Sequence, residues 1–386
     1  MPDTISMSTG ISPEFRINNL CYRIATPADD AKLRSILRQS PMTSWVTLST
    51  EHEPSYFASS DLFGQRKTII SHNSDCAGAT VGMCSYTELS AHINGSRSAA
   101  CYLGELRVLP EFRHKPAVVK NGFRSVEKFA GTLTDKAHWF TSIASENDVA
   151  RRFLEANLKG MPIYCPVGEL VTMALSTRAA RQSVEMSPAV EEDVPALVAF
   201  YNRQARQYQY SPVLSENWLL NLNRGSGLQL KDFYLLKMQG SIRACFAIWD
   251  QRQFKQAVVR GYRFPLNIMR LPYNLFSRLT GRVGLPGIGD CINYVFIAFL
   301  AVSKGMQSEY CRIIATALKL ARLARAEMAM LGLSTNNPNL NLLDSFHKQT
   351  YRSQVESVSW PDQFSTRGLP SLFSEQAVIQ PEIALL

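Results

Sequence analysis

The sequence predicts an α/β (α+β) fold made of two tandem copies of one domain, each a mixed, mostly antiparallel sheet flanked by helices. Segments of strand and helix character alternate along the chain, which is typical of such sheets. A spaced motif, Ala25-x-x-x-Asp29-x-x-x-Leu33, recurs as Ala189-x-x-x-Asp193-x-x-x-Leu197, and the order of elements after it repeats as well. At 386 residues the chain also exceeds the usual size of a single hydrophobic core.

These patterns divide the chain into two halves joined by a short linker. We expect a flexible arm at residues 1–20, an N-terminal domain at 21–177, a linker at 178–183 and a C-terminal domain at 184–386. Within the second domain, residues 251–289 have no counterpart in the first and are predicted to be an insertion.

The first copy begins with a strand at Cys21–Ala25. Thr26, Pro27 and the acidic residues after them then give the cap, first-turn proline and acidic first turn of a helix. The following elements are predicted as strands at Lys67–His72, Ala79–Glu88, Tyr102–Val108 and His138–Ser145, helices after Pro116 and at Glu146–Asn157, and a closing strand pair or long bent strand at Pro162–Leu175.

The second copy repeats this order at greater distance. A helix follows Asp193, and a hairpin turns at Gln239-Gly240. The remaining predicted elements are strands at Leu230–Met238, Ser241–Trp249, Asn293–Val302 and Gly332–Thr335, and helices at Ser308–Leu331 and Pro338–Phe346. Gly284, Gly287 and Gly289 precede a strand rather than joining a strand to a helix, so we interpret them as a turn and not as a phosphate loop.

The stretch from Tyr102 to Val119 is the most informative part of the sequence. A strand ends near Val108, and a helix begins after Pro116, with three consecutive basic residues, Arg113, His114 and Lys115, between them. The free amides and the dipole of a helix N-terminus attract anions, and basic side chains strengthen that attraction. The segment therefore predicts an anion site; the alternative is a basic turn in front of an ordinary core helix.

The same residues resemble the acyl-CoA signature of the GCN5-related N-acetyltransferase (GNAT) superfamily. Val108-Leu-Pro-Glu-Phe-Arg113-His-Lys-Pro-Ala-Val118 is similar to the segment with which that family binds the CoA pyrophosphate, and Ser145-Glu-Asn147-Asp-Val-Ala150 is similar to its next helix start. The resemblance implies a tandem GNAT protein with degenerate motifs that uses acetyl-CoA or another acyl-CoA as co-substrate and no metal. The donor-binding residues that it implies are Leu106, Val108, Arg113, His114, Lys115, Pro116, Ala117, Val118 and Asn147.

The chemistry implied is acyl transfer from a thioester to a small-molecule or protein amine, with acetyl transfer from acetyl-CoA as the first expectation. Glu105 resembles the carboxylate that some members of the family use as general base, and its alternative role is a salt-bridged glutamate. Asn147 could instead be only a helix N-cap. Pro116 and Val118 stand where the family has signature glycines, and Leu154 stands where it has a tyrosine that serves as general acid. Tyr102 and Tyr164 are then the remaining candidates for the acid.

The insertion at 251–289 carries seven basic residues and no acidic one, with aromatic residues between them. Such a run is suited to an acidic macromolecular partner, to a membrane surface or, with no nucleic-acid module beside it, less well to nucleic acid. The alternative is a basic cover over buried aromatic residues.

The composition sets the outer limits of the function. The net charge of +9 suits an anionic partner. The scattered cysteines and histidines show no metal-ligand spacing, and the N-terminus shows no secretory signal, so a cytoplasmic protein with free thiols is expected. No serine-hydrolase, zincin or Walker motif occurs. Three function classes remain: a CoA-dependent N-acyltransferase with an amine acceptor, an acyltransferase of the same fold with a carrier-protein donor, and a non-catalytic binding or regulatory protein.

Overall fold

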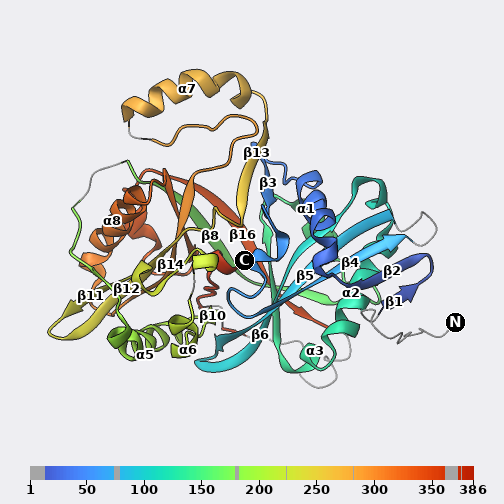
Figure 1. The fold of residues 1–386 in the computed structure, drawn as a ribbon, viewed down its shortest axis with the longest axis horizontal. Helices are drawn as coiled ribbons and strands as arrows, with labels where there is room; N and C mark the ends of the chain where they lie inside the picture. Colours follow the sequence, from blue (N-terminus) through green and yellow to red (C-terminus); the bar gives the residue numbers. More distant parts are fainter. Residues whose placement is uncertain are drawn as a thin grey trace.

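The computed structural model describes residues 14–73, 79–178, 182–222, 224–280, 282–360, 373–374 and 376–386, with Arg224 and Arg278 described by their backbone. Cys76 and the middle of the predicted linker, residues 179–181, lie outside the described residues. The two halves lie side by side along the longest axis of the molecule, with the last residues of the chain between them (Figure 1).

The N-terminal half follows the predicted order of elements. Its strands and helices are β1 (Glu14–Ile17), β2 (Leu20–Ile24), α1 (Asp30–Gln39), β3 (Val46–Glu51), β4 (Gln65–Asn73), β5 (Ala79–Ile93), β6 (Ser96–Val108), α2 (Pro116–Ala130), α3 (Leu133–Lys136), β7 (His138–Ala144), α4 (Asp148–Leu154) and β8 (Ile163–Ser176). Residues 14–17, expected in a flexible arm, instead pair with β2 as an antiparallel hairpin.

The C-terminal half repeats this plan with one long addition. Its elements are β9 (Ser187–Pro188), α5 (Val194–Ala205), β10 (Ser211–Pro212), α6 (Glu216–Leu220), β11 (Phe233–Met238), β12 (Ser241–Trp249), β13 (Gln256–Tyr262), α7 (Leu266–Thr280), β14 (Tyr294–Val302), α8 (Gln307–Leu323), β15 (Met328–Ser334) and β16 (Lys348–Ser359).

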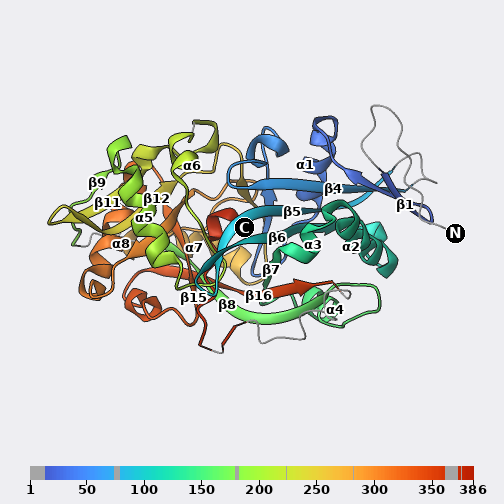
Figure 2. The same ribbon diagram turned by 90° about the horizontal axis from the view of Figure 1, so that it is seen from below.

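One continuous sheet joins the halves through a reciprocal exchange of strands. Along the path of this sheet the described strands follow the order β1-β2-β4-β5-β6-β7-β16-β8-β15-β14-β12-β11-β9. The C-terminal strand β16 therefore lies between β7 and β8, while β8 lies between β16 and β15 (Figure 2). Because each half completes the ladder of the other, we expect the domains proposed from the sequence to depend on each other for folding.

The internal repeat has a structural basis in the helix starts. Asp29 accepts a hydrogen bond from the backbone amide of Thr26, and Asp193 accepts one from the backbone amide of Val190. Each aspartate closes a short 3₁₀ turn that leads into α1 or α5. Leu33 and Leu197, four residues on, are both fully buried, at 0% exposure. The repeated motif therefore marks the equivalent start of a helix in each half.

The sequence placed two boundaries wrongly in the C-terminal half. The helix predicted to continue to Leu331 ends at Leu323, and Met328 already belongs to β15. Arg325 adopts a left-handed conformation with φ of 59° and turns the chain. Pairing of β15 with β8 on one side and β14 on the other outweighs the helix propensity of this alanine-rich stretch. The helix predicted at Pro338–Phe346 is only a 3₁₀ turn, Leu340–Leu343.

The predicted insertion forms a separate unit above the sheet. Its strand β13 pairs with β3 of the N-terminal half, and α7 projects from the body beyond that pair (Figure 1). Several of its basic residues have partners within the chain: Arg252 binds Asp250, and Arg260 binds Glu51. The positive charge available to an outside partner is therefore smaller than the sequence predicted.

Two further observations bear on the setting of the protein. Of the cysteines that the structure describes, Cys21, Cys84, Cys101 and Cys245 are buried, and all are free thiols. No helix among the described residues is both long and apolar enough to cross a membrane.

Candidate active site

The site begins where β6 and β7 separate. These parallel strands pair only from Ala100 to Tyr102 on β6, although both continue for several residues. At the point of separation Glu105 has a positive φ of 52°, and the register of β6 against β5 shifts between Met83 and Ser85. This is a β-bulge, which bends the strand and redirects its side chains. The sheet is therefore opened at Glu105.

A cavity of about 410 Å³ occupies this opening. Glu105, Leu106 and Asn147 line it, so these predicted site residues are brought together. Much of the remaining wall is apolar: Leu37, Leu103, Ile143, Leu154 and Phe296, with Ile383, Leu385 and Leu386 from the last residues of the chain. The cavity therefore combines one acidic group with an apolar surface, which is typical of a small-molecule site.

Glu105 is the centre of a network of polar side chains. Tyr56 donates a hydrogen bond of 2.5 Å to its Oε2. His52 Nε2 lies 3.3 Å and the Arg66 guanidinium 3.8 Å from its Oε1. The Glu105 side chain is still 20% exposed, so it can be reached from the cavity. Glu105 therefore both forms salt bridges, as the alternative role considered for it requires, and lies in the cavity wall.

The network keeps Glu105 ionised. Burial raises the pKa of Glu105, but Arg66, His52 and Tyr56 together outweigh burial and hold this pKa well below its usual range. Burial lowers the pKa of His52, so the imidazole is neutral at pH 7. Arg66 is therefore the positive partner that stabilises the carboxylate. Burial also raises the pKa of Tyr56 well above its ordinary value, so its phenol remains a donor.

Two cations also line the cavity. Lys255, at the start of the insertion, donates a hydrogen bond to the main-chain oxygen of Leu386, and burial lowers its pKa to about 8. Arg107 lies two residues beyond Glu105 and donates to the main-chain oxygen of Leu106. Among the described residues no carboxylate forms an ion pair with Arg107. Its charge is therefore directed to the cavity rather than to another side chain.

The cavity also holds the two candidate general acids. Tyr102 and Tyr164 both line it, and burial raises the pKa of both phenols, that of Tyr164 well above its ordinary value. Both therefore carry a proton at neutral pH. Leu154, at the position where the resembled family has its tyrosine, is buried in the same wall and contributes only apolar surface.

The predicted anion loop leads away from the cavity. Leu106, Val108 and Val118 line a small adjoining pocket of about 20 Å³ between the end of β6 and the first turn of α2. Arg113, His114, Lys115, Pro116 and Ala117 are exposed in front of this helix. The α2 helix begins at Pro116 without a side-chain cap or an acidic residue in its first turn. A free helix N-terminus beside exposed basic residues favours an anion.

Two predicted residues have structural contacts of their own. Arg113 Nε donates to the main-chain oxygen of Val108 at 3.0 Å, which ties the loop to the end of β6. Asn147 caps α4 by accepting a hydrogen bond from the Ala150 amide. The N-cap role considered for Asn147 is thus observed, and its position in the cavity wall is observed as well.

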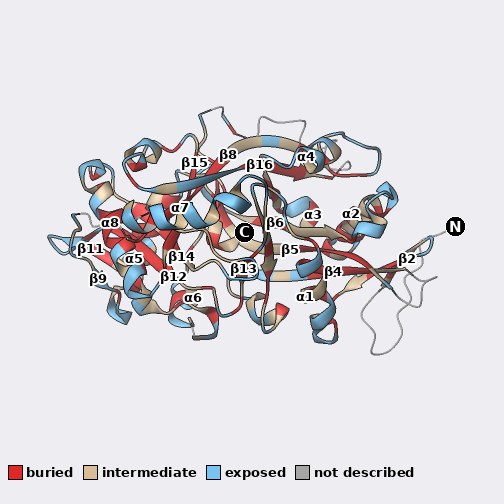
Figure 3. Ribbon diagram, turned by 90° about the horizontal axis from the view of Figure 1, so that it is seen from above, coloured by how far each residue is buried: buried red, intermediate tan, exposed pale blue. Residues whose placement is uncertain are grey.

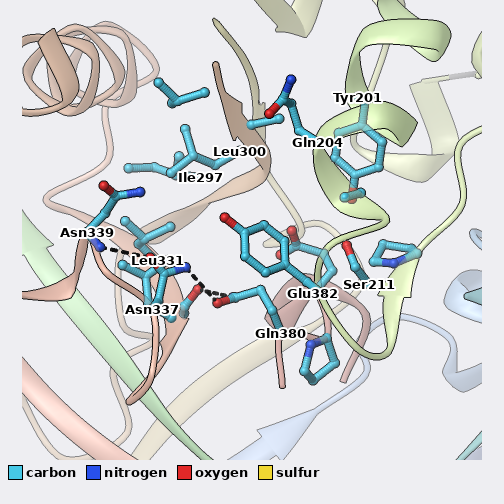
Figure 4. A pocket seen from close by; sticks show the side chains of 18 of the residues that line it. Tyr201, Gln204, Ser211, Ile297, Leu300, Leu331, Asn337, Asn339, Gln380 and Glu382 are labelled. Atoms are coloured by element: carbon cyan, nitrogen blue, oxygen red, sulfur yellow. Dashed lines mark hydrogen bonds between the residues drawn. The ribbon is translucent and has the colours of Figure 1, made fainter. Parts of the chain in front are cut away.

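The C-terminal half contains the matching opening. Strands β14 and β15 pair only from Tyr294 to Phe296 on β14, and Phe299 at the bulge has the same φ, 52°, as Glu105. Here the segment 380–384 lies in the gap: Gln380 and Glu382 reach between the separated strands (Figure 4), and Ile383 packs on Gly332. Glu382 accepts the Phe299 amide at 2.8 Å, while the Gln380 side chain bonds to the backbone of Gly332 and Ser334 on β15.

Close approach of this segment depends on glycine. A Cβ on Gly332 would lie 2.2 Å from a methyl carbon of Ile383. The remaining space in this opening is about 50 Å³. The chain itself thus occupies the position in the C-terminal half that is a cavity in the N-terminal half.

Sequence reasoning missed most of the residues around Glu105. His52 follows β3, Tyr56 lies in a 3₁₀ turn, Arg66 is the second residue of β4 and Lys255 precedes β13. None of them lies near Glu105 in sequence, and no local motif marks them. The sequence signal available for this site was the strand that contains Glu105. The described residues contain no cluster of metal-ligating side chains.

Comparison with known proteins supports the fold. No family model matches the sequence, and no curated protein does. N-myristoyltransferase of Saccharomyces cerevisiae with bound myristoyl-CoA is similar in structure, with a TM-score of 0.59 and 11% identity over 93% of this chain and 86% of that one. A second structure of that enzyme gives a TM-score of 0.58 and 12% identity over 93% and 84%. The predicted GNAT-like α/β fold is therefore confirmed.

Proposed function

We propose that the protein is an N-acyltransferase that binds acyl-CoA in the N-terminal half and transfers the acyl group to an amine. One observation carries this proposal: the cavity at the Glu105 bulge is followed along β6 by a free, basic helix N-terminus. A CoA thioester has its phosphates at one end and its acyl group at the other, so it matches these two sites in order. The fold shared with a myristoyl-CoA-binding enzyme is consistent with it.

In this proposal the donor is held at three places. Arg113, His114 and Lys115 attract the phosphates, with the α2 amides around Ala117 and Val118. The backbone at Leu106 and Val108, with Asn147, holds the pantetheine arm. The amide at the bulge is proposed to bind the thioester carbonyl, because the equivalent Phe299 amide binds a carboxylate oxygen in the other half.

The reaction forms a bond between the amine nitrogen and the thioester carbon and breaks the bond from that carbon to sulfur. Glu105 is proposed to attract the ammonium form of the acceptor and to accept its proton through water. Its low pKa keeps it ionised across the working pH range, which favours attraction of the ammonium; because a low pKa also makes a weak base, the proton is proposed to pass on through water to the solvent. Tyr102 or Tyr164, both protonated, is proposed to protonate the departing thiolate.

The apolar wall favours an acyl group larger than acetyl. Leu103, Ile143 and Leu154 would gain from contact with a hydrocarbon chain, at roughly 0.8 kcal/mol for each methylene buried. We therefore propose an acyl-CoA with a chain longer than acetyl as the donor, in place of the acetyl-CoA expected from the resemblance to the GNAT superfamily. A carrier-protein donor presents the same arm, but the internal pairing of Arg252 and Arg260 removes part of the surface that would dock it.

The test uses the full chain and CoA thioesters of increasing chain length. Thermal shift and calorimetry should show binding of CoA, with greater stabilisation as the acyl chain grows. Release of free CoA on addition of an amine panel, with the product identified by mass spectrometry, then shows transfer. Absence of a shift with every thioester would overturn the donor assignment, and binding without transfer to any amine would favour the non-catalytic class.

A further inference from the structure

Helix α7 has its amphipathic faces reversed relative to a normal surface helix. Two of its polar side chains bond to the loop that follows it: Asn274 donates to and accepts from the backbone of Leu285, and Arg270 donates to the main-chain oxygen of Pro286. Ser277 on the same side is buried, at 1% exposure. Surface helices ordinarily turn their apolar side to the core. The hydrogen bonds therefore fix α7 with its apolar side outward.

The outward side forms a continuous apolar face. Its residues are spaced three or four apart along the helix and just before it: Phe264, Ile268, Leu271, Leu275 and Leu279, with exposures of 74%, 69%, 74%, 65% and 82%. We call this set the α7 face. Figure 3, which looks onto α7, shows the helix largely exposed. Monomeric proteins rarely expose contiguous apolar surface of this kind unless it binds something.

The border of the α7 face carries the residues preferred at a lipid–water interface. Trp45 is 54% exposed and lies at the base of the helix, where its main-chain oxygen accepts a hydrogen bond from the Arg263 amide. The Arg263 guanidinium lies over the Trp45 ring, and that of Arg282 lies over the ring of Phe276. Indole rings concentrate at membrane interfaces, and arginines beside an apolar surface bind anionic headgroups.

The charges around this face select among partners. Arg263 and Arg282 are exposed, and residues 251–289 contain no carboxylate. A surface with large aliphatic and aromatic side chains and two arginines at its border complements a bilayer whose headgroups are negative. Asp290, which follows the insertion, accepts a hydrogen bond from the Gly287 amide. A protein partner would need an apolar groove with an acidic rim, which is a narrower requirement.

We propose that the α7 face is a membrane-docking surface that inserts into the interface of an anionic bilayer. The apolar side chains enter the boundary between headgroups and acyl chains, while Arg263 and Arg282 bind lipid phosphates. The polar side of α7 remains bonded to the 283–286 loop, so the helix lies flat and does not cross the membrane. Docking does not depend on the proposed acyltransferase activity, because it uses residues outside the cavity.

The proposal is tested by sedimentation of the full chain with vesicles of phosphatidylcholine containing phosphatidylserine, and with vesicles of phosphatidylcholine alone. The wild type should bind the anionic vesicles more strongly. The Leu271→Glu/Leu275→Glu double variant should lose about tenfold or more of the partition coefficient for each substitution, since each removes one leucine from the bilayer. Leu323→Glu on α8, where the leucine is 73% exposed but is not part of the α7 face, is the matched control and should bind as the wild type does.

A second variant keeps the test valid if the double variant folds poorly. Arg263→Gln/Arg282→Gln should weaken binding to anionic vesicles by about fivefold for each arginine and leave binding to neutral vesicles unchanged. Failure of the wild type to bind either vesicle, or equal binding by the Leu271→Glu/Leu275→Glu variant, would overturn the proposal. If the wild type does not bind vesicles but forms a dimer, and the Leu271→Glu/Leu275→Glu variant is a monomer, then a second copy of the chain covers the α7 face instead.

Discussion

The two halves contain the same opening in the sheet, but only one of them is a cavity. In both, a pair of parallel strands separates after three paired residues at a bulge with φ of 52°. At the N-terminal bulge stands Glu105, which is reachable from a space of about 410 Å³. At the C-terminal bulge stands Phe299, buried at 1% exposure, and the opening is filled by residues 380–384.

The two β-bulges have the same backbone conformation but different surroundings. The bulge presents an amide in each half. In the C-terminal half this amide binds the chain's own Glu382, and the Phe299 ring packs among Phe63, Trp218, Phe233 and Trp249. The same segment then continues to Ile383 and Leu385 in the wall of the N-terminal cavity. The segment that occupies the C-terminal opening thus also forms part of the wall of the N-terminal cavity.

The helices that follow the two openings, α2 and α8, differ in the charge of their first turns. The first turn of α2 contains no acidic residue and follows a basic loop. The first turn of α8 contains Glu309, which is paired with Arg312. A carboxylate at a helix N-terminus occupies the favourable field that a phosphate would use. The N-terminal half is therefore the one suited to an anionic donor.

The largest expected effect is on catalysis at the open bulge. Glu105→Gln should lower turnover by roughly 10²-fold or more with little change in donor affinity, because it removes the charge that accepts the proton. Steady-state kinetics with the donor and amine identified by the panel measure it. Tyr56→Phe is the matched control, since it keeps the carboxylate and removes the hydroxyl that bonds to Glu105 and Thr68. Unchanged turnover in Glu105→Gln would place the base elsewhere.

The next effect concerns stability and has opposite signs at the two carboxylates. Burial raises the pKa of Glu382 from 4.5 to about 7. The folded state therefore binds more protons than the unfolded state between these pH values. The stability that Glu382 contributes is complete below pH 4.5 and is lost as pH rises to about 7, by about 3 kcal/mol. Glu382→Gln should remove this loss, measured by denaturant unfolding across the pH range.

Glu105 should behave in the reverse way. Its pKa is lowered, so its contribution is complete above the unfolded pKa of 4.5 and is lost as pH falls through the folded value. Glu105→Gln should therefore destabilise the protein at neutral pH, where it leaves Arg66 without its carboxylate. Equal pH dependence in the two variants would contradict the contrast between the two bulges.

A third prediction compares the loops before the two helices. Arg113→Ala should weaken acyl-CoA binding by about 1–3 kcal/mol, as expected for a lost charge-assisted contact with phosphate. Lys304→Ala, at an exposed lysine before α8, should leave the affinity unchanged. Calorimetry on the full chain measures both variants, because the exchanged strands make an isolated half an unsuitable sample. Equal weakening by both changes would show only general attraction by positive charge.

The smallest expected effect is on stability, and it compares Gly332, which contacts the segment in the C-terminal opening, with Gly122, which does not. Gly332→Ala forces Ile383 to move and should destabilise the protein by about 1–3 kcal/mol while loosening residues 380–384. Gly122→Ala on α2 meets only a ring carbon of Tyr22 at 4.0 Å, so it should be neutral or stabilise by up to about 1 kcal/mol. Thermal unfolding with limited proteolysis distinguishes them.

The elements predicted well are those whose signals are local. The cap and apolar spacing of α1, the hairpin at Gln239-Gly240 and the strand–loop–helix from Tyr102 to Ala130 all agree with the structure. Their signals are hydrophobic period, turn residues and caps, which are properties of neighbouring residues. The loop to which we assign acyl-CoA binding was predicted in this way from one short segment.

The elements missed depend on distant partners. Strand β16 was not predicted, because its place between β7 and β8 is set by pairing across the two halves. Strand β15 was predicted as mostly helix for the same reason. His52, Tyr56 and Arg66 meet Glu105 only after the sheet has formed, and the role of residues 380–384 requires both the opening and the segment that fills it. Contacts of this kind leave no periodic signal in the sequence.

Hydrogen exchange with and without acyl-CoA tests the central claim, that the donor binds the open half and the chain itself fills the other. The full chain should bind one acyl-CoA, with slowed exchange confined to the bulge of β6, the 109–115 loop and the start of α2. The equivalent residues at Phe299 and the start of α8 should not change. Protection at both bulges, or at Phe299 with release of residues 380–384, would contradict the account.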